Sequence, residues 1–127
     1  MSLVNGIHHV SLKCSSDAEY KEELKFYGEI LGLSIIREWE KGIMFDTGNG
    51  LIEIFNDGND HLPKGTIRHF AFSTNDVDAC VKAVANAGYE VFVNPKDIVI
   101  KTTPAFPARV AFCKGPLGEE IEFFCEK

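Results

Sequence analysis

The stretch GIHHVSL at residues 6–12 returns in altered form as TIRHFAF at residues 66–72. In each stretch a histidine, His9 or His69, precedes the pattern apolar, small, apolar. This alternation is typical of a strand with one packed face and one open face. Because the two histidines stand 60 positions apart (69 minus 9), the recurrence indicates two copies of one structural unit.

The residues after the first stretch predict a helix and then three strands. Ser16 stands three residues before Glu19, which is the spacing of a capping box, and Gly32 is a suitable residue for ending the helix. Turn-forming residues separate the apolar segments that follow. The predicted strands of the first half are 7–14, 34–38, 42–46 and 51–55.

The second half repeats this order after a polar stretch. A strand at 67–73 precedes a helix that is capped by Asn75 or Asp76 and ended by Gly88. Four further strand segments are predicted at 89–93, 98–102, 108–113 and 120–124, where the first half has three. We therefore expect one α+β domain of two βαβββ modules, at about 5–56 and 66–127, joined by a linker at about 57–65.

Composition limits the classes of function. The 127 residues are 45% hydrophobic and 25% charged, which is typical of a folded protein. A net charge of -6 without a long basic run argues against nucleic-acid and anionic-membrane partners and leaves a small molecule as the expected ligand. The four cysteines form no CxxC pair and no signal peptide is recognisable, so we expect a cytoplasmic protein with buried, reduced thiols.

Strand periodicity places a possible metal site on the open faces. His9 and His69 alternate with bulky apolar neighbours on the first strand of each half, whereas His8 falls in phase with the packed face. Glu53 and Glu122 alternate in the same way on the last strand of each half. Two imidazoles and two carboxylates suit nickel, cobalt, zinc, manganese or iron. Taken singly each could be an ordinary surface residue; the repetition favours a shared role.

The chain resembles the vicinal oxygen chelate superfamily, which includes glyoxalase I, bleomycin-resistance proteins and extradiol dioxygenases. The similar segments are HVSL at 9–12, FYGEILGL at 26–33, IEI at 52–54, HFAF at 69–72 and GEEIEF at 118–123. The resemblance implies curled mixed sheets around a metal-binding cavity. Because the superfamily hosts many chemistries, it indicates the fold more strongly than the activity.

Within the superfamily, the order His, Glu, His, Glu is most similar to bacterial glyoxalase I, lactoylglutathione lyase. This resemblance implies that His9, Glu53, His69 and Glu122 hold a divalent metal ion, with nickel or cobalt favoured. It further implies that Glu122 and Glu53 transfer protons while a hemithioacetal of methylglyoxal and a thiol becomes a hydroxyacyl thioester. A homodimer is expected, since relatives commonly form one.

Three residues are candidates for substrate binding. Lys13 stands four positions after His9, where glyoxalase I has a basic residue, and Asn56 adjoins the position of a family asparagine, which is Asp57 here. Phe106, in a predicted loop between two prolines, is a candidate lid. Phe92, Phe112 and Trp39 could also line a pocket.

Two other functions remain open at this stage. The first is another superfamily metalloenzyme, such as a methylmalonyl-CoA-type epimerase, although such enzymes commonly carry an amide where Glu53 stands. The second is a non-catalytic protein that binds a small molecule or confers resistance. The acidic Asp57 makes glutathione a less suitable thiol, because it would repel the carboxylates of that molecule.

Overall fold

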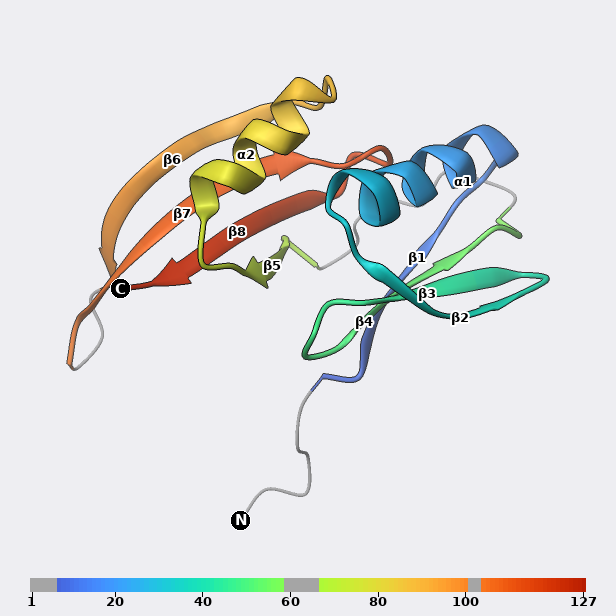
Figure 1. Cartoon of the computed structure of the whole chain (residues 1–127), viewed down its shortest axis with the longest axis horizontal. Coiled ribbons are helices and arrows are strands. Elements are labelled where there is room, and N and C mark those ends of the chain that lie inside the picture. The colour runs from blue at the N-terminus through green and yellow to red at the C-terminus, as the bar shows by residue number, and fades with distance from the viewer. Residues whose placement is uncertain (1–6, 59–66, 101–103) are drawn as a thin grey trace, which may run out of the picture. The chain divides into compact units, whose positions relative to one another are not determined.

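The structure, a computed structural model, describes residues 7–58, 67–100 and 104–127. The chain divides into two compact units, Met1–Leu62 and Pro63–Lys127. Each unit has the order strand, helix, three strands, as predicted (Figure 1). Both four-stranded sheets are curled and not closed, which confirms the α+β class and the two βαβββ modules.

The first unit pairs its first strand with its last. The sheet order is β1-β4-β3-β2, with β1 parallel to β4 and the other pairs antiparallel. The helical segment between β1 and β2 begins as an α-helix and continues as a π-helical turn. The elements are β1 (His9–Lys13), α1 (Asp17–Leu24), η1 (Lys25–Ile30), β2 (Ser34–Trp39), β3 (Gly42–Asp46) and β4 (Leu51–Phe55).

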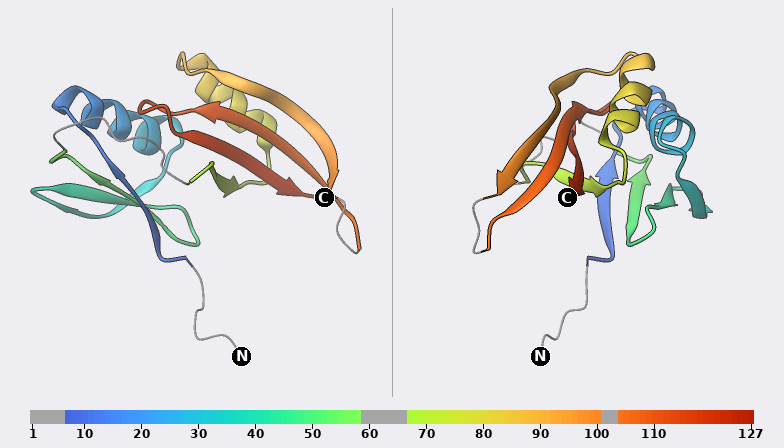
Figure 2. Two further views of the ribbon diagram at one scale, coloured as in Figure 1. Left: turned by 180° about the vertical axis from the view of Figure 1, so that it is seen from behind. Right: turned by 60° about the vertical axis from the view of Figure 1, so that its left-hand side comes forward.

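The second unit repeats this topology. Its sheet order is β5-β8-β7-β6, with β5 parallel to β8. Figure 2 shows α2 lying along one face of this sheet, and α1 along one face of the first sheet. The elements are β5 (Phe70–Ser73), α2 (Val77–Asn86), β6 (Val91–Ile100), β7 (Phe106–Lys114) and β8 (Glu120–Glu126).

The helix signals read from the sequence are confirmed. The Ser16 hydroxyl accepts the Glu19 N–H at 3.1 Å, and Asp76 accepts the Ala79 N–H at 3.0 Å, so both N-termini are capped. Gly32 and Gly88 follow the two helices with φ of 73° and 92°, a conformation that glycine adopts without strain.

The packed faces of the strands form the cores. In the first unit Ile52 and Ile54 are buried on either side of Glu53, and Phe45 contacts the ring of Tyr27 on η1. In the second unit Ile121 and Phe123 are buried on either side of Glu122. Each core therefore lies on the opposite side of its sheet from the predicted open face.

Three predictions for the second unit were wrong. The predicted strands at 89–93 and 98–102 are one strand, β6, within the described residues. It passes through Pro95 because the register with β7 shifts between Val93 and Lys96, and an irregularity of this kind tolerates the missing N–H of proline. Phe106 lies in β7 opposite Ile100 and not in a loop, and His69 immediately precedes β5 instead of lying inside it.

The π-helical turn also departs from the prediction. The sequence predicted a helix here, and its last six residues, Lys25–Ile30, form a π-helical turn. The fully buried side chains of the helical segment are Glu23 on α1 and Phe26 and Tyr27 on η1. Gly28 fits against Phe45, where an added Cβ would stand 3.0 Å from the ring. The four cysteines are free thiols. No helix among the described residues is long and apolar enough to cross a membrane.

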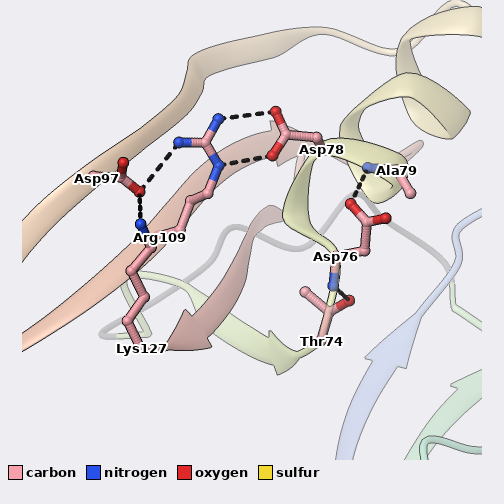
Figure 3. A network of polar contacts seen from close by, with 7 residues as sticks. All are labelled: Thr74, Asp76, Asp78, Ala79, Asp97, Arg109 and Lys127. Carbon is pink, nitrogen blue, oxygen red and sulfur yellow. Dashed lines mark hydrogen bonds and ion pairs between the residues drawn. The ribbon is translucent and has the colours of Figure 1, made fainter.

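A network of charged side chains links α2 to strands β7 and β6 (Figure 3). Arg109 on β7 donates to both carboxylate oxygens of Asp78 on α2, at 2.7 and 2.9 Å, and to Asp97 on β6 at 3.2 Å. The Lys127 ammonium lies 2.7 Å from the same Asp97 carboxylate. These hydrogen bonds lower the pKa of Asp78 and of Asp97 below the usual value and raise that of Arg109.

Replacing Asp78 by asparagine is expected to lower the thermal midpoint of unfolding at neutral pH. Because the pKa of Asp78 is lowered in the folded state, its stabilising contribution is present above the usual carboxyl pKa of about 4 and is lost as the pH falls through the lowered value. Melting curves of the wild type and Asp78→Asn from pH 7 to about pH 2 should therefore converge. Glu126→Gln, which removes an exposed carboxylate from β8, is the control. Equal midpoints at neutral pH, or a difference that persists in acid, would contradict the prediction.

Candidate metal and substrate site

Parallel pairing of β1 with β4 brings His9 close to Glu53. The register places Ser11 opposite Glu53, and His9 lies two residues before Ser11 on the same face. His9 Nε2 is 3.4 Å from Glu53 Oε1. Glu53 is only 8% exposed, so this carboxylate belongs to a shielded site and not to an open surface.

Parallel pairing of β5 with β8 makes the same arrangement in the second unit. Ala71 lies opposite Glu122, and His69 stands two residues before Ala71. His69 Nε2 is 3.2 Å from Glu122 Oε1. The two units therefore hold one imidazole and one carboxylate at equivalent places in the topology.

The surroundings of Glu122 make it a stronger base than a solvated glutamate. Burial raises the pKa of Glu122, and the nearby His69 imidazole opposes part of this rise. The residue opposite Glu122 on β7 is Phe112, and the equivalent residue opposite Glu53 on β3 is Met44. Each carboxylate therefore has a large apolar neighbour across the sheet.

The spacing within each pair fits a shared cation. Nitrogen and oxygen ligands about 2.1 Å from one metal ion, at right angles to each other, stand about 3 Å apart. The separations of 3.4 and 3.2 Å need only a small adjustment to reach this value. Among the described residues no group of three or more His, Cys, Asp or Glu side chains is placed to hold a metal ion, and each unit by itself presents one histidine and one glutamate.

His8 behaves differently from the prediction. It is exposed instead of packed, and its Nδ1 lies 3.0 Å from Nδ1 of His9. Strand β1 begins at His9, so the alternation of faces does not extend to His8. The imidazole of His8 can therefore orient that of His9.

The predicted substrate-binding residues have other partners. Lys13 Nζ lies 3.8 Å from Asp57 Oδ1, so a neighbouring acid partly offsets its charge. The Asn56 side-chain amide donates to the Glu40 carbonyl at 2.9 Å, and this hydrogen bond stabilises the turn between β2 and β3. Phe106 pairs with Ile100 near the end of the β6–β7 hairpin. The fourth histidine, His61, lies in the polar stretch between the two halves and outside the described residues.

A pocket of about 160 Å³ adjoins His69 in the second unit. Phe92 and Phe112 line it, as the sequence suggested, whereas Trp39 packs against Phe55 with the ring centroids 5.7 Å apart. The sequence analysis did not single out the other lining residues. They are Arg68, Val93 and Glu120, and the strand periodicity of β8 already places Glu120 on the face of Glu122.

The topology and the paired donors define a protein of duplicated βαβββ modules with a histidine and a glutamate on the open face of each. Residues 6–123 match the model of the Glyoxalase/Bleomycin resistance protein/Dioxygenase superfamily, and the chain belongs to this superfamily. Its members typically bind divalent metal ions and small-molecule substrates.

Solved structures agree with this assignment. A glyoxalase family protein from Bacillus anthracis is 27% identical, with a TM-score of 0.73 over 100% of this chain and 99% of that one. A glyoxalase family protein from Enterococcus faecalis is 21% identical, with a TM-score of 0.72 over 97% and 99%. A glyoxalase/bleomycin resistance protein/dioxygenase from Alicyclobacillus acidocaldarius is 18% identical, with a TM-score of 0.68 over 96% and 92%. No curated protein matches the sequence.

Proposed function

We propose that the protein is a metal-dependent lyase of the glyoxalase I type, acting as one domain and as a homodimer in the cytoplasm. The observation that carries the proposal is the duplicated pair, His9 with Glu53 and His69 with Glu122, at N–O separations of 3.4 and 3.2 Å. The two pairs, from one chain or from two copies, hold one divalent cation. Nickel or cobalt is favoured, and zinc, manganese or iron also suits the donor set.

The reaction would move one proton between adjacent carbons. The substrate is a hemithioacetal of methylglyoxal and a thiol, and the bound cation supplies a Lewis acid that stabilises negative charge on its oxygens. Glu122 takes the proton from the carbon that bears sulfur and returns it to the neighbouring carbon. The hydroxyl proton moves to the other oxygen, and the product is a hydroxyacyl thioester. Glu53 serves the opposite side of the substrate.

Metal affinity tests the ligand set. His69→Ala and Glu122→Ala should each weaken nickel binding at least about 100-fold, because each removes a direct donor from the set. Isothermal titration of the metal-free protein, with circular dichroism to confirm folding, measures this. Glu126→Gln, on the same strand as Glu122, is the matched control and should retain the wild-type affinity. Unchanged binding in folded His69→Ala and Glu122→Ala would overturn the proposed site.

Activity tests the reaction. The nickel-loaded wild type, given methylglyoxal and a panel of thiols, is expected to form a thioester that absorbs in the ultraviolet, and Glu122→Gln is expected to lose this activity. A fully loaded protein that forms no thioester with any thiol would contradict the lyase assignment.

An epimerase is the second candidate, because the partial neutralisation of Lys13 by Asp57 weakens the case for glutathione. The same base would then exchange the acidic proton of a carboxylated acyl thioester. Deuterium uptake by methylmalonyl-CoA, followed by NMR, would favour this activity. Metal-independent binding without proton exchange would favour a binding protein.

The ion pair of Lys13 and Asp57 leads to a prediction about the affinity for a charged thiol. Asp57→Asn removes the negative charge 3.8 Å from Lys13 Nζ, so that Lys13 can hold a thiol carboxylate. The KM for the glutathione adduct should fall about two- to fivefold, with kcat unchanged, since exposed charge pairs contribute modestly. The adduct of uncharged 2-mercaptoethanol is the control and should show no change. A fall of equal size for both thiols would exclude this role of the charge.

A further inference from the structure

Three of the six residues that line the pocket, His69, Phe92 and Phe112, carry rings. Phe112 meets the His69 imidazole edge-to-face, with centroids 5.1 Å apart and an interplanar angle of 88°. Phe92 extends the wall, with its centroid 5.7 Å from that of Phe112. Val93 adds an aliphatic group. A neutral apolar group is therefore the kind of ligand that these walls favour.

The volume of the pocket limits the size of that group. A dry cavity of about 150 Å³ in another protein holds one benzene molecule. The pocket here has about 160 Å³, so it matches one six-membered ring or a branched chain of similar bulk. A methyl group would leave most of this space unfilled, and its walls would lose contacts.

The charges at the pocket do not favour one sign of ligand. The guanidinium of Arg68 and the carboxylate of Glu120 line it together, and the Lys114 ammonium lies 5.8 Å from the centre of the Phe92 ring. Because these charges are of opposite sign, the pocket does not require a charged group inside it. The polar end of a ligand is better placed at the imidazole.

The His69 imidazole borders both the Glu122 carboxylate and the pocket. Its Nε2 lies 3.2 Å from the Glu122 carboxylate, while its ring forms part of the pocket wall. A molecule that binds through its oxygens beside His69 can therefore extend its substituent into the pocket without leaving the site. Phe92 is 38% exposed, so the pocket stays open to entry.

We propose that this pocket, formed by Phe92, Val93 and Phe112 beside His69, binds a ring-sized apolar substituent on a substrate with two vicinal oxygens. Within the proposed reaction, aryl or branched-alkyl 2-oxoaldehyde adducts are then bound more tightly than the methylglyoxal adduct. The oxygen-binding part of this inference rests on the proposed function. The pocket itself depends only on the second unit.

Mandelate and lactate test the preference, because they offer the same two oxygens and differ in a phenyl or a methyl group. Calorimetry on the nickel-loaded protein should give mandelate at least about tenfold tighter binding, from the extra apolar area buried. Phe92→Ala should bring the ratio close to one, with lactate and nickel binding unchanged. Val93→Phe, which fills the pocket, should weaken the binding of mandelate and leave the binding of lactate unchanged. Val99→Ala, at a 61% exposed position on the same strand, is the control and should keep the wild-type ratio.

A second measurement separates the pocket from the metal. Benzyl alcohol, added to the metal-free protein, should shift the amide NMR signals of His69, Val93 and Phe112, and these shifts should disappear in Phe92→Ala. Equal binding of mandelate and lactate to the loaded wild type, or the absence of these shifts, would overturn the pocket proposal alone. Failure to bind nickel, with the benzyl alcohol shifts present, would overturn the proposed function and leave the pocket standing.

Discussion

The parallel pairing of the first and last strands of each module is the constraint on which the rest depends. It sets Ser11 opposite Glu53 and Ala71 opposite Glu122, so a histidine two residues earlier in the chain reaches the carboxylate in both units. Parallel strands require a long connection, and the helix with the two intervening strands provides it. A slip of one residue in this register would turn each glutamate into its core and expose the isoleucine beside it.

The Glu53 and Glu122 carboxylates are both partly removed from water, and this cost requires a compensating interaction. Removing a carboxylate from water is unfavourable unless another group compensates for it, yet Glu53 is 8% exposed and burial raises the pKa of Glu122. Each has an imidazole within 3.4 Å, and that single contact replaces only part of the lost hydration. The proposed cation, bound beside such a pair, would supply the compensation that the buried carboxylate lacks.

Periodicity predicted the elements that repeat locally, and it could not predict contacts between distant residues. Strands β3 and β4 match their predicted bounds because turn formers flank short apolar runs. Strand β6 replaces two predicted strands, because its ladder with β7 accommodates Pro95 by a register shift, which is a tertiary property. Arg109 and Asp78 are 31 positions apart in the sequence, so no local pattern predicts their ion pair. The face of each candidate ligand followed from alternation; the distances between ligands did not.

The two modules share their donors but differ in what surrounds them. Met44 occupies the position opposite Glu53 and contacts the guanidinium of Arg37 at 3.4 Å, whereas Phe112 occupies the position opposite Glu122 and lines a pocket. Duplication therefore preserved the residues suited to a cation, and divergence changed the neighbouring strand. A superfamily that keeps one frame of metal donors can alter its substrate in this way, since a side chain on β7 can change the pocket while the backbone pairing of β7 with β8 is retained. Substrate choice in this chain is then expected to depend on β6 and β7 more than on the strands that carry histidine and glutamate.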